Sequence, residues 1–264
     1  MKKILLFLFA SYLLVGVTAQ AQLNTLAGKT WIINSKIQGT VSIQSPMGEM
    51  DIPSTSDIQH ELSIRQIAGT TVKGVTVLKK ITGSTSIMGQ ETKFDSDDKT
   101  IMNNPQMAEM LKSLKKEEPF VLENKKTKTE STIAAAVSIT GNELAAIFLL
   151  PLSDAVLKLN FEWKEEINDG KGTKATVNYR ITQLSATDVV IEANTQADIT
   201  GTVKQFNMEV KQNMKGTIKA IRTYSRQTGV LLQEKKMVDL TGNNQMMGQE
   251  MPMTMRGTVI SVVK

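Results

Sequence analysis

The amino-acid sequence predicts a mainly β protein with a minor α component: a long, curved antiparallel sheet or half-barrel with one or two short amphipathic helices. Three observations support this fold class. Apolar and polar residues alternate with a period of two along most of the chain, which places each set on one face of a sheet. Turn-forming residues separate the alternating runs. A helical period occurs only in the middle of the chain, between 101 and 152.

The alternation is clearest in two neighbouring runs, 157–164 and 174–181. Charged and polar residues separate the apolar members of each run, which are Leu157, Leu159, Phe161 and Trp163 in the first, and Ala175, Val177, Tyr179 and Ile181 in the second. The segments 58–65, 189–198, 205–225, 230–246 and 252–263 continue the pattern. One apolar and one polar face is typical of antiparallel sheets.

Glycine-containing turns are expected between these strands, at Asn168–Gly172 and at Ser225–Gly229. A Met-Gly pair also occurs three times between strand-like runs, at positions 47–48, 88–89 and 247–248. The glycine would relieve a positive φ at a hairpin tip. The methionines are interpreted either as ordinary turn and core residues or as an exposed rim that grips an apolar partner.

Two helices are predicted in the middle of the chain. Asn104 and Pro105 are suited to the N-cap and the first helical position. Apolar residues then follow at helical spacing, at Met107, Met110, Leu111 and Leu114. A shorter helix is expected from Glu143 to Leu149, ending before Pro151.

The N-terminal residues 1–21 form a predicted secretory signal peptide, with Lys2 and Lys3 before an apolar stretch and with Ala19 and Ala21 at the cleavage site. The expected mature start is Gln22, and no later segment is predicted to span a membrane. Residues 22–264 are interpreted as a single β-rich domain, or as two sub-units, 22–100 and 153–264, joined by the partly helical segment 101–152. The predicted location is the periplasm, with secretion or association with the outer membrane as alternatives.

Composition and motifs exclude several classes of function. The chain has no cysteine, which excludes disulfides, thiol catalysis and a lipid-modified N-terminus. Loss of Lys2 and Lys3 leaves 29 basic against 26 acidic side chains, too small an excess to predict a nucleic-acid partner.

The short motifs that resemble functional sites are incomplete. The string Gly28-Lys29-Thr30 lacks the earlier glycine of a phosphate-binding loop. His60 is the single histidine, and its place in the 58–64 run predicts a partly buried, hydrogen-bonded side chain. The acidic run 95–98 lacks the glycine and glutamate of a calcium loop. No enzyme, cofactor or metal site is therefore predicted.

Parts of the chain resemble an exported β-rich family of Bacteroidota-type bacteria that has a domain of unknown function. The resemblance is carried by the Ala-Gln-Ala-Gln end of the signal peptide, Ile87–Gln90 to Phe94–Ser96, Leu150-Pro151 through Phe161–Trp163, and the strands from Phe206 onward. It implies export and a β-rich fold, and it supplies no catalytic residues.

Two functions are compatible with these observations. The first is a non-enzymatic binding module for a lipid or other apolar ligand in the cell envelope. In that case a wall and a lid would contact the ligand, the wall formed by Phe161, Trp163 and Tyr179 and the lid by Met107, Met110 and Leu111. The alternative is a structural or interaction protein of the envelope that uses sheet edges and hairpin tips. Under that alternative the six residues are ordinary core.

Overall fold

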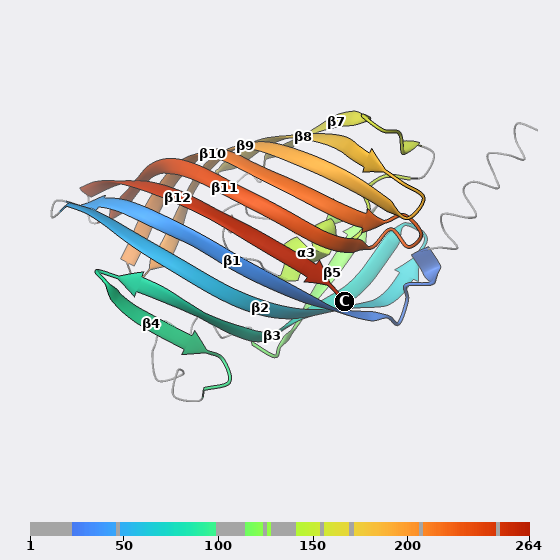
Figure 1. Ribbon diagram of the computed structural model, residues 1–264, viewed down its shortest axis with the longest axis horizontal. Helices are drawn as coiled ribbons and strands as arrows, with labels where there is room; N and C mark the ends of the chain where they lie inside the picture. Colours follow the sequence, from blue (N-terminus) through green and yellow to red (C-terminus); the bar gives the residue numbers. More distant parts are fainter. Residues whose placement is uncertain are drawn as a thin grey trace, which may run out of the picture.

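The fold is a single twelve-stranded sheet (Figure 1). The structure is a computed structural model, and it describes residues 23–45, 48–98, 114–123, 126–127, 141–153, 156–168, 172–205, 208–246 and 249–264. The strands are β1 (Thr30–Ser45), β2 (Gly48–Ala68), β3 (Thr71–Ile87), β4 (Gln90–Asp95), β5 (Glu117–Glu123), β6 (Lys126–Thr127), β7 (Glu162–Asn168), β8 (Thr173–Leu184), β9 (Asp188–Gln205), β10 (Met208–Ser225), β11 (Leu231–Met246) and β12 (Gln249–Val263). One helix, α3 (Gly141–Phe148), accompanies them. The predicted fold class is confirmed.

The strand order is β6-β5-β3-β2-β1-β12-β11-β10-β9-β8-β7, and β4 pairs with β3. All named strand pairs are antiparallel. The first and last strands are neighbours, because β1 pairs with β12 from Ile33–Val263 to Ile43–Met253. This pairing joins the two predicted sub-units into one sheet, with β6 and β7 at the ends of the strand order.

The two faces of the sheet differ in polarity. The register places Ile37 beside Val259 on one side and Ser56 on the other, and the same face continues through Val238, Ile191 and Val177. This face contains nearly all of the buried core and is called the inner face. The opposite, outer face exposes charged and hydroxyl side chains. The sequence alternation therefore becomes one buried and one solvated face.

Glycines on the inner face allow neighbouring strands to approach closely. A Cβ at Gly242 of β11 would collide with the carbonyl oxygen of Asn213 on β10. A Cβ at Gly74 of β3 would collide with the carbonyl oxygen of Ser63 on β2 and with the Phe120 ring. Glycine within a strand is typical of such close backbone approaches.

Helix α3 crosses the inner face at one end of the sheet, which we call the covered end (Figure 1). The aromatic ring of Phe148 contacts Trp31 edge-on at 4.9 Å between centroids. The hydroxyl of Tyr224 on β10 donates to the carbonyl oxygen of Ile147 over 2.9 Å. The backbone amide of Leu150 then donates to the carbonyl of Gly229 over 2.7 Å. The helix predicted from Glu143 to Leu149 is thus confirmed, beginning two residues earlier and ending one residue earlier.

The other end of the sheet, which we call the open end, holds the strand ends at Ser45, Ile87, Asn168, Gln205 and Met246. Of the three Met-Gly pairs, the pair at 88–89 lies wholly within the described residues, and it falls here. Met88 and Gly89 have φ angles of 52° and 79° and form the predicted hairpin tip between β3 and β4. Met47 and the pair at 247–248 lie outside the described residues, as do the signal peptide and positions 104–113 of the first predicted helix. In the described part of the chain, no helix is long and apolar enough to cross a membrane.

Candidate functional site

The predicted aromatic wall is present on the inner face of β7 and β8. The rings of Phe161 and Trp163 stack at 5.8 Å between centroids, and those of Trp163 and Tyr179 at 4.7 Å with an interplanar angle of 8°. All three are partly buried and pack against the main core. The structure therefore brings the three residues together, and their role as a ligand wall stays a prediction. The predicted lid residues Met107, Met110 and Leu111 lie outside the described residues.

A row of polar side chains crosses the otherwise apolar inner face on four adjacent strands. It consists of Arg222 on β10, Glu234 on β11, Ser261 on β12 and Ser35 on β1, each paired with the next in register. Arg222 Nε donates to Glu234 Oε1 over 2.9 Å, and the two side chains are 18% and 4% exposed. The hydroxyls of Ser35 and Ser261 are 2.8 Å apart and buried. We call these four residues the polar row.

Two tyrosines adjoin the Arg222 end of this row. Burial raises the pKa of Tyr179 to about 12, although the Arg222 charge opposes that shift. Burial also raises the pKa of Tyr224, again against the influence of Arg222. Burial is the largest influence on the pKa of Arg222 and acts to lower it, but Glu234 together with Tyr224 and Tyr179 outweighs burial, and the net direction is upward. Arg222 and Glu234 form a charged pair, and both tyrosines stay neutral hydrogen-bond donors at neutral pH.

Lys236 faces inward one step along β11 from Glu234. Its register partners are the buried residues Ala220 and Val259, and Lys236 itself is partly buried. No hydrogen bond or ion pair involves its ammonium group among the described residues. Arg222 and Lys236 are thus both inner-face cations, but only Arg222 has a counter-charge.

His60 lies on the inner face of β2, between Ile33 of β1 and Leu78 of β3. It is 3% exposed, which is deeper than the partial burial that its place in the apolar run predicted. The prediction that it would be hydrogen-bonded is wrong for Nδ1, which is buried with no partner among the described residues. Burial lowers its pKa to about 4, so His60 is neutral at pH 7.

The inner face of the open end is an apolar wall rich in methionine. Its central buried members are Met214 on β10, Leu240 on β11 and Met253 on β12, and Val41, Ile43 and Met255 pack against them while partly exposed. In the described part of the chain, α3 belongs to the apolar cluster of the covered end and not to this one. A flexible, polarizable methionine surface adapts to partners of varied shape.

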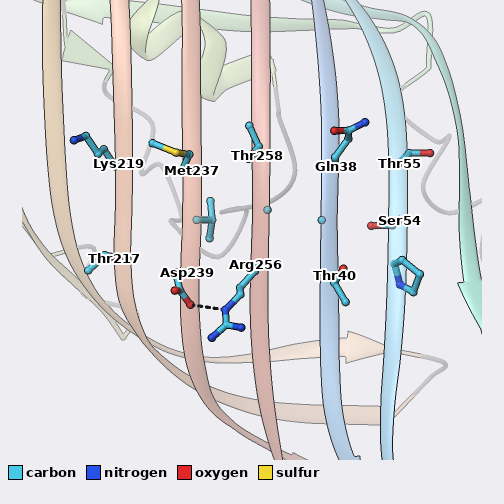
Figure 2. A pocket seen from close by; sticks show the side chains of 14 residues that line it. Gln38, Thr40, Ser54, Thr55, Thr217, Lys219, Met237, Asp239, Arg256 and Thr258 are labelled. Carbon is cyan, nitrogen blue, oxygen red and sulfur yellow. Dashed lines mark hydrogen bonds and ion pairs between the residues drawn. The ribbon is translucent and has the colours of Figure 1, made fainter.

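The outer face has a broad depression of about 620 Å³ over β10, β11, β12, β1 and β2. Figure 2 shows its side chains pointing away from α3, which lies behind the sheet. Threonines and charged residues form half of its lining, and Arg256 Nε pairs with Asp239 Oδ1 over 3.3 Å.

The acidic run that was compared with a calcium loop begins at the last residue of β4. The acidic run 95–98 is occupied by a lysine, because Lys80 Nζ lies 2.5 Å from Asp97 and 3.5 Å from Asp95. Across the described residues, no three histidine, aspartate or glutamate side chains converge as a metal site would require.

Comparison with known proteins gives similarities of fold at low identity. No protein family matches the chain, and no curated protein matches it either. Among solved structures it is similar to lipovitellin, with a TM-score of 0.48 and 8% identity over 90% of this chain. The chain spans 25% of the length of lipovitellin.

Two further structures come from bacterial envelopes. An outer membrane channel from Pseudomonas putida F1 has a TM-score of 0.29 at 9% identity, over 90% of this chain and 96% of the channel. An outer membrane lipoprotein-sorting protein domain from Vibrio parahaemolyticus has a TM-score of 0.20 at 9% identity, over 92% and 88% of the two chains. We therefore argue function from the faces of the sheet and not from these proteins.

Proposed function

We propose that the protein is an exported, non-enzymatic envelope protein that binds a lipid or other apolar ligand on the inner face of its sheet. The observation that carries this proposal is the apolar wall of the open end. Its residues Val41, Ile43 and Met255 stay partly exposed while the helix packs elsewhere. Contiguous apolar surface that is left without a covering element is typical of binding sites.

The polarity of the two faces supports the same function. The outer face has exposed ion pairs on several strands, such as Arg256–Asp239, Lys215–Asp198 and Lys219–Glu192, and therefore favours water. The inner face of the same strands presents aliphatic and methionine side chains. A ligand with an acyl chain would gain free energy by leaving water for that inner face, at about 25 cal/mol per Å² of apolar surface buried.

The test is native mass spectrometry and lipid extraction of protein purified from the periplasm. Copurifying acyl species are expected with the wild type and with Thr254→Glu, which changes the outer face of β12. They should be lost with Met255→Glu, which puts a charge in the apolar wall one residue away. A ligand-free wild type that also fails to bind added lipid would contradict the proposal.

A second function, as an interaction protein, is favoured by one hairpin tip. Ile87 and Met88, between β3 and β4, are 49% and 81% exposed, and Met88 lies in one of the three Met-Gly pairs. If this tip grips an envelope partner, Ile87→Ser with Met88→Ser should abolish cross-linking to that partner in cells and leave lipid content unchanged. Unchanged cross-linking would contradict this second function.

A further inference from the structure

We propose that Lys236 binds the head group of the ligand, and that the ligand is a single-chain anionic amphiphile, a fatty acid. This inference rests on the lipid-binding function proposed above and specifies the chemistry of that ligand. The starting observation is an inward-facing ammonium group without a counter-charge. Lys236 lies in register between Ala220 and Val259, both of which are buried on the apolar face.

Inner-face carboxylates lie on the outlying strands, at Glu118 of β5 and at Glu165 of β7, where Glu165 accepts from the Tyr179 hydroxyl over 3.3 Å. On the strands between them that form the apolar wall, one positive charge is left without an ionic partner. On the described inner-face positions of β1, β2 and β8 to β12, the ionisable side chains apart from tyrosine are His60, Arg222, Glu234 and Lys236. His60 is neutral at pH 7 because burial lowers its pKa to about 4. Arg222 and Glu234 neutralise each other over 2.9 Å. Lys236 remains, and one carboxylate would balance it.

The position of Lys236 also suits a head group, because it lies where the polar row meets the apolar wall. Towards the covered end, the next inward residue on β11 is Glu234 of the polar row. Towards the open end, the next are Val238, Leu240 and Gly242, alongside Met255 and Met253 of β12. The six residue-to-residue steps from Lys236 to Gly242 extend about 20 Å in a strand, a length suited to a long acyl chain. The acyl chain would then lie along the methionine wall with its carboxylate on Lys236.

Lys236 is preferred over Arg222 as the anion-binding group because of what each already contacts. A ligand carboxylate that binds Arg222 must compete with Glu234. If the ligand displaced Glu234, the buried Glu234 carboxylate would be left unpaired. A carboxylate that binds Lys236 displaces only water. A hydrogen bond to a charged donor in a partly desolvated site is stronger than one between neutral groups.

The test compares palmitate with monopalmitoylglycerol, which has the same acyl chain and no charge. Displacement of a dansylated fatty acid from delipidated protein measures both affinities. Lys236→Met should weaken palmitate binding about tenfold or more and leave monopalmitoylglycerol binding unchanged. Lys235→Met is the matched control, since Lys235 is the next residue of β11 and faces the outer side. It should leave both affinities unchanged, and Lys236→Arg should retain palmitate binding.

The outcomes separate this inference from the proposed function. If wild-type protein binds both lipids and Lys236→Met binds palmitate as well as wild type does, the head-group assignment is wrong and the lipid-binding function stands. If Lys236→Met loses both lipids at an unchanged melting temperature, the assignment is also wrong, because the lysine then acts through its alkyl stem. If wild-type protein binds neither lipid, the proposed function itself fails.

Discussion

The covered end and the open end of the sheet are built from the same strands and the same alternating sequence pattern, but among the described residues only the covered end has a helix packed on it. At the covered end, Leu144 and Phe148 of α3 complete a core with Trp31, Leu62 and Ile33. At the open end, Met214, Met253 and Met255 form a wall on the same face. Within the described residues, the apolar face is core where α3 covers it and stays partly exposed at the open end, which is the surface we propose for ligand binding.

The two ends also differ in the kind of apolar residue they use. The covered end holds aromatic and branched aliphatic side chains in fixed contacts, including the Trp31–Phe148 pair at 4.9 Å. The wall of the open end has a larger share of unbranched methionine, whose three rotatable bonds allow it to adapt to a ligand. Rigid packing stabilises the fold at one end, and adaptable packing suits exchange of a ligand at the other.

The largest expected effect is the loss of the helix contact. Phe148→Ala removes a fully buried ring and should lower the free energy of unfolding by about 3–5 kcal/mol. Met255→Ala, in the partly exposed wall, should lower it by less than about 2 kcal/mol. Urea unfolding of the two variants measures the difference. Equal losses would mean that the open end is packed as tightly as the covered end.

The polar row lies between the two ends and is expected to have the next largest effect. Glu234→Gln leaves the Arg222 charge buried without a counter-charge and should cost about 3 kcal/mol. The double variant Arg222→Met with Glu234→Leu removes both charges, and its stability should be within about 1 kcal/mol of wild type. Urea unfolding of Arg222→Met, of Glu234→Leu and of the double variant gives the coupling free energy of the pair. If the double variant is as unstable as the single variants, the pair stabilises the fold by more than neutralising its own two buried charges.

A smaller effect is expected from pH, and it comes from the covered end. The pKa of His60 is about 4 in the folded protein and about 6.5 when the chain is unfolded. Between these values the unfolded chain binds more protons, so stability rises with pH across this window and is lost as pH falls through it. At pH 5 the loss relative to pH 7.5 should be about 2 kcal/mol.

The control for this prediction is His60→Leu, which has no proton to bind at that position. Urea unfolding at pH 5 and pH 7.5 should show a smaller difference for this variant than for wild type, by about 2 kcal/mol. An unchanged difference would assign the pH dependence to other groups.

The smallest effect is expected on the outer face, which both ends share. Arg256 and Asp239 are 70% and 56% exposed, so solvent screens their interaction. Asp239→Asn should change the free energy of unfolding by no more than about 0.5 kcal/mol, and less at high salt. Urea unfolding at low and high salt tests this. A larger change would indicate that the outer depression contributes to the packing of the sheet.

Much of the fold could be predicted from local patterns. Period-two alternation predicted which residues of β8 lie on the inner face, including Tyr179 and Ile181. It also predicted that His60 lies on the apolar face with Ile58 and Leu62. The short helix ending before Pro151 was predicted because proline cannot continue a helix. These features depend only on residues close together in the chain.

The candidate site was predicted only in part, because most of it is assembled across strands. The aromatic wall was found since Phe161 and Trp163 alternate within one run. The polar row was missed, because Arg222, Glu234, Ser261 and Ser35 are far apart in sequence and meet only through strand pairing. Lys236 was missed for a related reason. The inward positions 234 and 236 of β11 are both charged, so apolar and polar residues do not alternate there and the inward face cannot be recognised from the sequence.

The sequence by itself determined the class of sheet, because the spacing of apolar residues along each strand sets which side chains share a face. It also determined the absence of cysteine chemistry and predicted export. The tertiary structure decided which strands are neighbours, that β1 pairs with β12, and which end receives α3. Those decisions depend on contacts between distant residues, and they place one unpaired lysine beside an apolar wall that the chain itself leaves uncovered in its described part.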